Sequence, residues 1–369
     1  MRHGYGSPYI VELRLTQRCN LKCRFCATTV STYDYSIELD VNKLLEAVRD
    51  AAELGVERWV IVGDGEPTYR LKDCLAVMRA VKSHGMRGSM LTNGTMLTTE
   101  SIREMTGMGW DHICISLDGP NPDINDNLRG VSGAFSRAVL TIERINRAKS
   151  EAGSLLPVLD IQTVITARNF TVLEDMIHLA AENGIGRVTF QPVVYHQGAD
   201  RSLLLPVQDV QELKRSIPDV LRAAESRGVH TNLAAFLERP MIEHANSMTR
   251  LLVPERIPEH PLLAYPCYEP WYLIAIRPDG GVDPCPHVRA DPSSNLRRHS
   301  LRELWTGRYF TGFRERIAGK GMFKECDKCC SVGVIHNQEM RQMLEGDLYA
   351  IRSQGLQVPF ESLSPLRGP

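Results

Sequence analysis

Three closely spaced cysteines near the start of the chain carry the clearest chemistry in the sequence. Cys19, Cys23 and Cys26 form a CxxxCxxC run directly after the apolar stretch 9–15. Three thiolates can bind three irons of a cubane 4Fe–4S cluster, whereas four are normally needed to bind all four irons. The fourth iron is then open to a ligand that is not protein. A structural zinc site fits this run poorly, because it would use four ligands in CxxC pairs.

A second group of cysteines lies in the C-terminal part of the chain. Cys267, Cys285, Cys326 and Cys329 could hold a second cluster through four thiolates, or a tetrahedral structural zinc ion. Cys330 is then the odd thiol of the group. It could be a spare neighbour, an alternate ligand or a hydrogen-atom donor.

The elements that must position the first three cysteines alternate regularly between strand and helix. The expected strands are residues 9–15, 57–63, 86–92, 111–117, 158–166 and 186–193. The expected helices are residues 41–54, 71–84, 99–108, 133–150 and 171–183. This alternation predicts an α/β fold with a parallel sheet and helices on its outer face, and six units would form a partial (β/α)6 barrel. The cysteines follow the first strand and so fall at the carboxyl ends of the strands, where such folds bind ligands.

Three further turns follow the next strands in order. They are Gly63-Asp64-Gly65-Glu66-Pro67, Thr92-Asn93-Gly94 and Ser116-Leu117-Asp118-Gly119. Together with the cysteine run they resemble the radical S-adenosylmethionine (SAM) superfamily over about residues 9–200. In that superfamily the open iron binds the amino and carboxylate groups of SAM, and an electron from the cluster cleaves SAM to a 5′-deoxyadenosyl radical. The sequence departs from the usual GGEP turn at Asp64, where the family has a glycine.

The resemblance implies which residues contact SAM. Glu66 and its turn would meet the ammonium group, Phe25 would pack on adenine, and Ser116 would lie near the ribose or the carboxylate. Arg129, in a segment similar to the family's RGxxGxF, would hold the carboxylate through two parallel hydrogen bonds, which a lysine could not copy. The full expected set is Phe25, Gly65, Glu66, Asn93, Ser116, Asp118 and Arg129.

The C-terminal cysteines lie in a pattern that resembles the twitch module, the shortened relative of the SPASM module. A β-hairpin is expected around residues 274–285, and a helix capped by Ser300 follows it before the final CxxC. The resemblance implies a small α+β module with one auxiliary 4Fe–4S cluster on Cys267, Cys285, Cys326 and Cys329. The expected division of the chain is a barrel at 1–205, a helical extension with a proline-rich linker at 206–266, the auxiliary module at 267–335, and a C-terminal helix and tail at 336–369.

An auxiliary cluster could accept the electron of a substrate radical, while a base takes the proton. The pattern is nearest to aminocyclitol dehydrogenases, so we expect oxidation of a secondary alcohol in a sugar-like or aminocyclitol-like small molecule. The alternatives are a radical epimerase with a cysteine hydrogen donor, a peptide-modifying radical SAM/SPASM enzyme, and a non-catalytic iron–sulfur or zinc scaffold. The candidate catalytic residues are Cys330, His196 and Glu12.

Composition sets the expected surroundings of the protein. A formal charge of −1 over 369 residues gives no electrostatic reason to expect nucleic-acid or membrane-surface binding. The ten cysteines, clustered as they are, are most simply reduced, which predicts a cytoplasmic protein. The expected partners are a small-molecule substrate or a peptide, and a reductant such as flavodoxin or ferredoxin.

The first prediction concerns iron content. After anaerobic reconstitution, the Cys19→Ala/Cys23→Ala/Cys26→Ala variant is expected to retain about four irons, because a second cluster is bound elsewhere in the chain. Iron and sulfide are counted in the variant and in the wild type. Loss of all iron with zinc retained would contradict the second cluster and make the C-terminal site structural.

Overall fold

The structure is a computed structural model that describes residues 6–30, 32–194, 199–238, 242, 263, 265–288, 291–319, 321–323, 326, 337 and 340–344. Its described strands form one sheet in the order β7-β6-β5-β4-β3-β2-β1-β8-β9. The strands are β1 Ile10–Arg14, β2 Arg58–Val62, β3 Arg87–Thr92, β4 His112–Ser116, β5 Val158–Ile165, β6 Arg187–Pro192, β7 His230–Thr231, β8 Leu273–Ile276 and β9 Val282–Asp283. All neighbouring pairs are parallel except β8 and β9.

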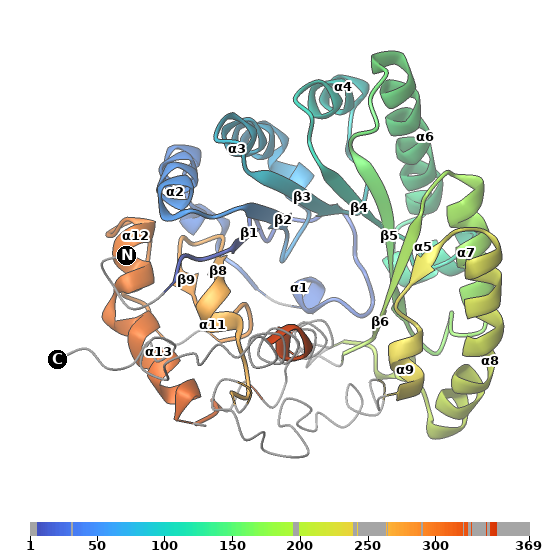
Figure 1. Cartoon of the computed structure of the whole chain (residues 1–369). Coiled ribbons are helices and arrows are strands. Elements are labelled where there is room, and N and C mark those ends of the chain that lie inside the picture. Colours follow the sequence, from blue (N-terminus) through green and yellow to red (C-terminus); the bar gives the residue numbers. More distant parts are fainter. Residues whose placement is uncertain are drawn as a thin grey trace, which may run out of the picture.

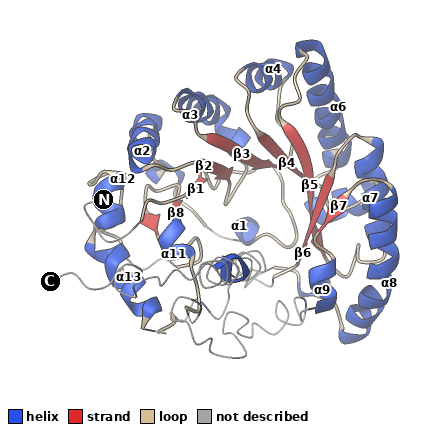
Figure 2. Cartoon of the chain, viewed as in Figure 1, coloured by secondary structure: helices blue, strands red, loops and turns tan. Residues whose placement is uncertain are grey.

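Helices cover the outer face of this curved sheet, which forms a partial barrel (Figures 1 and 2). The α-helices are α1 Ala27–Val30, α2 Val41–Leu54, α3 Leu71–Ser83, α4 Thr99–Gly107, α5 Pro122–Arg129, α6 Ala134–Ala152, α7 Leu173–Glu182, α8 Val207–Ser226, α9 Ala234–Glu238, α11 Glu269–Tyr272, α12 Leu301–Thr306 and α13 Arg308–Ala318. Short 3-10 turns lie at Tyr35–Ile37, Pro67–Arg70 and Arg201–Leu203. The α/β fold class and the partial barrel are confirmed.

The six strands and five helices expected between residues 9 and 192 are all present, with ends within two residues of those expected. Helix α5 was not expected. It is short and polar, and Ile124 and Leu128 are its only large apolar side chains. Its start is set by Asn121, whose side chain accepts a hydrogen bond from the backbone of Ile124 at 3.1 Å, as N-cap residues do.

The C-terminal hairpin joins the barrel sheet, which the sequence did not predict. Strands β8 and β9 form the expected antiparallel pair, with Ala275 opposite Asp283. Strand β8 also pairs in parallel with β1, and Ile10 lies opposite Leu273. The hairpin is therefore an extension of the sheet beside β1. Most of the expected proline-rich linker and of the C-terminal tail lies outside the described residues.

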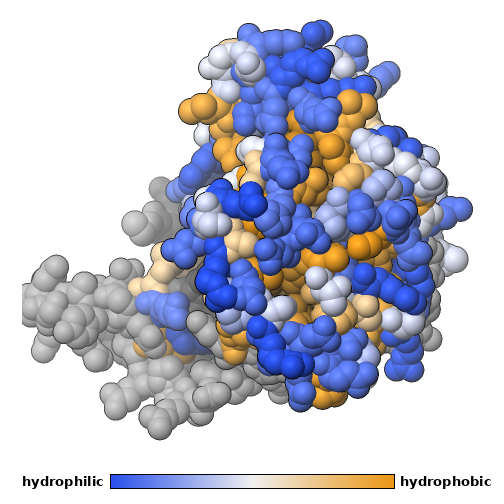
Figure 3. Space-filling model, turned by 90° about the vertical axis from the view of Figure 1, so that its right-hand side faces the viewer, coloured by the Kyte–Doolittle hydropathy of each residue, from blue (hydrophilic) through white to orange (hydrophobic). Residues whose placement is uncertain are grey.

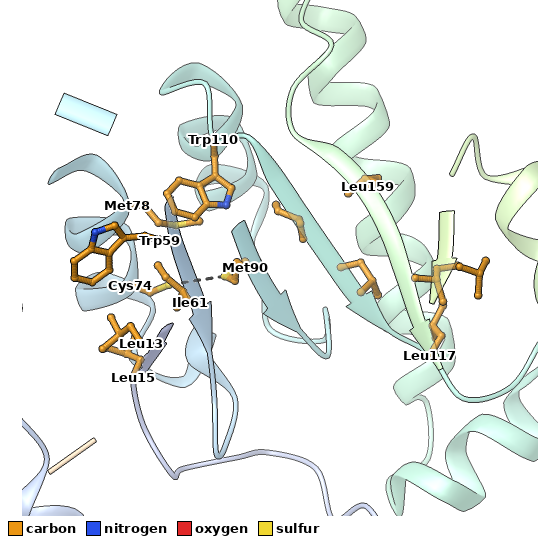
Figure 4. Close-up of a cluster of buried hydrophobic side chains, with 14 of the residues drawn as sticks. Leu13, Leu15, Trp59, Ile61, Cys74, Met78, Met90, Trp110, Leu117 and Leu159 are labelled. Carbon is orange, nitrogen blue, oxygen red and sulfur yellow. Dashed lines mark hydrogen bonds between the residues drawn. The ribbon is translucent and has the colours of Figure 1, made fainter. Parts of the chain in front are cut away.

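The core lies between the sheet and its outer helices (Figure 4). Strand β1 alternates, with Val11 and Leu13 fully buried toward the helices and Glu12 and Arg14 partly exposed on the other face. The labelled side chains of Figure 4 are Leu13, Leu15, Trp59, Ile61, Cys74, Met78, Met90, Trp110, Leu117 and Leu159, and all are buried. The polar side chains of β1 thus lie inside the barrel, as the alternation of the sequence predicts.

The outer helices are amphipathic. In α8 the buried residues are Val210, Leu213, Ile217, Val220 and Ala224, at the spacing of one helix face. The surface that Figure 3 shows is accordingly largely hydrophilic, with hydrophobic atoms visible between the polar side chains. Within the described part of the chain, no helix is both long enough and apolar enough to span a membrane.

The packing of Gly88 against Trp110 gives a prediction about stability. A Cβ atom at Gly88 in β3 would lie 2.1 Å from the fully buried Trp110 ring. Gly88→Ala should therefore lower the free energy of unfolding by about 1–3 kcal/mol through overpacking. Gly107→Ala is the control, since nothing lies within 4 Å of its added Cβ. Urea unfolding measures both, and equal stability of the two variants would contradict the packing argument.

Candidate active site

The three N-terminal cysteines lie in the segment 16–26, here called the cysteine loop, which leaves the carboxyl end of β1. Cys19 is exposed, Cys23 is buried and Cys26 is partly buried. Helix α1 follows the loop directly and lies inside the open barrel (Figure 1). The loop therefore occupies the end of the sheet at which parallel α/β folds bind ligands.

The turn after β2 holds the first half of the cysteine loop through its backbone. The N–H of Gly65 donates to the carbonyl of Thr16 at 2.9 Å, and that of Glu66 donates to the carbonyl of Arg18 at 2.8 Å. A Cβ atom at Gly65 would lie 2.2 Å from the Arg18 carbonyl oxygen. Position 65 therefore requires glycine because two backbones approach closely there.

The C-terminal end of α5 holds the second half of the loop in the same way. The N–H of Lys22 donates to the carbonyl of Arg129 at 3.1 Å, and that of Arg24 donates to the carbonyl of Leu128 at 3.0 Å. Gly130 ends the helix with φ +69°, and a Cβ atom there would lie 2.2 Å from the Lys22 carbonyl oxygen. A left-handed glycine at the end of α5 thus also makes room for the loop.

The turn after β3 contacts the loop through side-chain amides. Asn93 donates to the amide oxygen of Asn20 at 3.0 Å, and Asn20 donates in turn to the hydroxyl of Thr95 at 2.8 Å. The backbone of Thr95 returns a hydrogen bond to the amide oxygen of Asn93 at 2.9 Å. The expected residue Asn93 therefore lies beside the cysteines, where it fixes the loop.

Hydrogen bonds to two of the three sulfurs fit the loop to a cluster. The N–H of Leu21 donates to Sγ of Cys19 at 3.4 Å, and Nη1 of Arg129 donates to Sγ of Cys23 at 3.9 Å. Burial raises the pKa of the Cys23 thiol to about 11, against the opposing effect of the Arg129 charge. Donors of this kind stabilise the negative charge of cluster-bound sulfur. The residues present therefore fit a cluster held by Cys19, Cys23 and Cys26.

Within the described residues, no three His, Cys, Asp or Glu side chains are placed to share one metal ion.

Glu66 is buried and its carboxylate is well supplied with hydrogen bonds. Oε1 accepts from the hydroxyl of Thr92 at 2.6 Å and from the backbone of Thr68 at 3.0 Å, while Oε2 accepts from the backbone of Asn93 at 2.7 Å. The carboxylate thereby joins the turn after β2 to the turn after β3. A contact between Glu66 and the ammonium group of SAM stays a prediction.

A cavity of about 670 Å³ opens beside the cysteine loop. It is lined by Arg14, Gln17, Phe25, Cys26, Ala27, Thr28, Thr32, Tyr33, Gly63, Asp64, Val164, Gln191, Pro192, Val193, Val194, Pro286 and His287. Its size is typical of a small-molecule or cofactor site. Of the expected SAM contacts, Phe25 lines this cavity. The C-terminal module contributes Pro286 and His287, which directly follow Cys285.

Charged side chains from β1 and from the turn after β2 stand at this cavity. Nη1 of Arg14 lies 2.7 Å from a carboxylate oxygen of Asp64, and Nε of Arg14 lies 3.1 Å from a carboxylate oxygen of Glu12. Asp64 lines the cavity, whereas the candidate catalytic residue Glu12 is not among the lining residues. The sequence marked Asp64 only as a departure from the family pattern. A carboxylate at a position where the family has glycine was the signal that could have identified it as a site residue.

The remaining expected SAM contacts lie away from the cavity lining. Ser116 ends β4 and is partly buried opposite Gln162. Asp118 is fully buried and ion-paired with Arg129, whose Nε lies 2.7 Å from its carboxylate. The structure brings Asp118 and Arg129 together. Arg129 contacts Cys23 of the cysteine loop, and Asp118 contacts the backbone of Val164 in β5.

Two of the C-terminal cysteines, Cys267 and Cys285, lie in a small hydrophobic cluster. Buried Cys267 packs with Val288, Phe313 and Ile317, and Cys285 lies against them. The N–H of His287 donates to Sγ of Cys285 at 3.4 Å, which resembles the donors around the first cysteines. Burial raises the pKa of the Cys267 thiol. These surroundings fit cluster ligands at Cys267 and Cys285.

Several expected site residues cannot be placed. Cys329, Cys330 and His196 lie outside the described residues. Cys326 is described and is partly buried. The proposed ligand set of the second cluster and the hydrogen-donor role of Cys330 therefore stay predictions.

Comparison with known proteins places each cysteine group within a known type of domain. Residues 13–180 match the model of the radical SAM superfamily, and residues 267–330 match SPASM, described as an iron–sulfur cluster-binding domain. The chain contains a radical SAM domain followed by a SPASM domain. These domains imply SAM, a SAM-binding 4Fe–4S cluster and additional iron–sulfur binding in the SPASM domain. The sequence suggested the shortened twitch form, whereas the matched model is that of SPASM.

Related proteins match most of the length of this chain. The PqqA peptide cyclase of Ruegeria pomeroyi is 28% identical over 330 residues, which cover 87% of this chain and 80% of the relative. The AdoMet-dependent heme synthase of Oleidesulfovibrio alaskensis is 24% identical over 327 residues, which cover 87% and 81%. Both relatives carry enzyme names, and these support enzyme status for this protein.

The solved structures agree with the fold. Streptococcus suis SuiB bound to S-adenosylmethionine matches with a TM-score of 0.64 at 18% identity, covering 84% of this chain and 68% of SuiB. Native anSMEcpe with bound AdoMet matches with a TM-score of 0.62 at 19% identity, covering 87% and 86%. At these identities the likeness supports the fold alone.

The close approach at Gly65 predicts an effect on iron binding. Gly65→Ala should displace the cysteine loop, because the added Cβ would overlap the Arg18 carbonyl, and should remove about four irons per chain. Gly186→Ala is the control, since no atom lies within 4 Å of its added Cβ. Iron is counted after anaerobic reconstitution, and thermal unfolding checks that both variants fold. Full iron content in Gly65→Ala would show that the loop tolerates the displacement.

Proposed function

We propose that this protein is a radical SAM enzyme that oxidises or crosslinks a peptide. The relatives carry this proposal, because PqqA peptide cyclases of Ruegeria pomeroyi and Methylocella silvestris match over 87% and 88% of the chain. They favour the peptide alternative over the oxidation of a sugar-like or aminocyclitol-like alcohol. The sequence pattern of the cysteines alone had favoured that oxidation.

The cavity supports a reaction that involves both cysteine groups. One side of it is formed by Phe25 and Cys26 of the cysteine loop, and another by Pro286 and His287 beside Cys285. When bound, the reduced 4Fe–4S cluster supplies the electron that cleaves SAM. A substrate group in this cavity would lie between the two sets of ligands, which suits the transfer of an electron from the substrate to the SPASM domain.

The chain's own residues then have distinct proposed roles. Cys19, Cys23 and Cys26 hold the first cluster, and the apolar surface of Phe25 and Val164 excludes water from the ligand. Asp64, held by Arg14, is the carboxylate that lines the cavity and is our candidate for taking the substrate proton. It replaces Glu12 in that role, since Glu12 does not line the cavity.

A second candidate is the oxidation of a small molecule. The heme synthase of Oleidesulfovibrio alaskensis matches 87% of the chain, nearly the same share as the peptide cyclases. The same test applies to two reactions that the sequence suggests. These are the dehydrogenation of an alcohol and an epimerisation in which a cysteine donates the hydrogen atom. A flavodoxin or ferredoxin as the reductant also remains a proposal.

The substrate class is tested by SAM cleavage in the presence of cell-extract fractions. The reconstituted protein, reduced with dithionite, is expected to form more 5′-deoxyadenosine when a peptide fraction is added. Digestion of that fraction with pronase should abolish the increase, because the hydrogen donor is a peptide. The Cys19→Ala/Cys23→Ala/Cys26→Ala variant is the control and should form no 5′-deoxyadenosine.

Two outcomes would overturn the peptide proposal. An increase that survives pronase and is found in the small-molecule fraction would assign a small substrate. Deuterium transfer to 5′-deoxyadenosine from labelled small metabolites, with none from labelled peptides, would do the same.

A further inference from the structure

A buried guanidinium–carboxylate pair lies directly behind the cysteine loop. The side chain of Arg129 is 10% exposed and that of Asp118 is fully buried, and Nε of Arg129 lies 2.7 Å from Oδ2 of Asp118. Removing charges from water is costly, so such a pair persists only where each charge has a partner. The guanidinium is therefore fixed in place and is not free to follow a ligand in the cavity.

The guanidinium of Arg129 also contacts the cysteine loop. Nη1 of Arg129 donates to Sγ of Cys23 at 3.9 Å, and the guanidinium carbon lies 5.6 Å from the centre of the Phe25 ring. The carbonyl of Arg129 accepts from the backbone of Lys22 at 3.1 Å. Three separate contacts thus direct this residue to the cysteine loop, and Arg129 is not among the residues that line the cavity.

Asp118 links Arg129 to β5, the strand that contributes Val164 to the lining of the cavity. Its Oδ1 accepts from the backbone N–H of Val164 at 2.8 Å, and its carbonyl accepts from the side chain of Asn169 at 2.8 Å. Val164 lines the cavity. A continuous series of contacts therefore runs from Cys23 through Arg129 and Asp118 to the strand that faces the ligand.

We propose that Arg129 sets the reduction potential of the SAM-binding cluster by donating to the Cys23 thiolate, with Asp118 as its counter-ion. Hydrogen bonds to cluster sulfurs and positive charge nearby both favour the reduced, more negative form of a cluster. Arg129 is then a positioning and tuning residue, and the SAM carboxylate is held elsewhere. The inference concerns the cluster and does not depend on the substrate.

The two members of the pair should act with opposite signs. Arg129→Gln removes the positive charge beside Cys23, and its cluster should become harder to reduce. Asp118→Asn removes the opposing negative charge while its side-chain oxygen can still accept from Val164, and its cluster should become easier to reduce. A residue that only held the fold together would not produce opposite shifts.

The experiment is a redox titration of the reconstituted holoenzyme followed by electron paramagnetic resonance, without SAM. The SAM-binding cluster is identified by its signal, which changes when SAM is added and is missing in the Cys19→Ala/Cys23→Ala/Cys26→Ala variant. Arg129→Gln is expected to lower the ratio of reduced to oxidised cluster about tenfold at a fixed potential, a shift of about 59 mV for one electron. Asp118→Asn is expected to shift the potential to more positive values.

Matched variants complete the design. Arg129→Lys keeps the positive charge and should shift the reduction potential less than Arg129→Gln does. It is the variant to titrate if Arg129→Gln fails to bind iron. Arg137→Gln removes an exposed arginine from the neighbouring helix and should leave the potential unchanged. An unchanged SAM-free potential in the Arg129 variants, together with weaker SAM binding, would assign Arg129 to the SAM carboxylate and overturn the proposal. Shifts of the same sign in the Arg129 and Asp118 variants would also overturn it.

Discussion

The cysteine loop lies so close to two glycines that no side chain fits between the backbones. A Cβ atom at Gly65 or at Gly130 would come within 2.2 Å of a carbonyl oxygen of the loop. Backbone hydrogen bonds at both places hold the loop against the turn after β2 and the end of α5. Because the three thiols sit on this one loop, their position relative to the sheet depends on these two contacts.

Two guanidinium–carboxylate pairs join the elements around the site. Arg14 and Asp64 connect β1 to the turn after β2 at the cavity, while Arg129 and Asp118 connect α5 to the turn after β4 behind the loop. Loss of Arg129 or Asp118 would leave a buried charge without its ion-pair partner, whereas Arg14 would keep Glu12 as a partner if Asp64 were lost. The same groups that could tune the chemistry thus also fix the geometry of the turns.

Strand β1 connects the two iron–sulfur domains. The cysteine loop leaves its carboxyl end, and β8 of the SPASM region pairs along its edge. The hairpin that follows β8 leads to Cys285 and to His287, which lines the same cavity as Cys26. Parallel pairing of β8 with β1 therefore brings a segment more than 250 residues away to the ligand site, which explains how one cavity can contact both domains.

The sequence alone determined the barrel and the cysteine loop, because strand and helix periodicities and the cysteine spacing are local patterns. It located Glu66, Asn93 and the turns at the strand ends for the same reason. Tertiary structure decided what those residues contact. Arg129 is buried against Asp118 and Cys23, and β8 extends the barrel sheet; both depend on segments far apart in the chain that no local pattern relates. The polar helix α5, whose end holds the loop, was missed because its stability comes from tertiary contacts and capping and not from an apolar stripe.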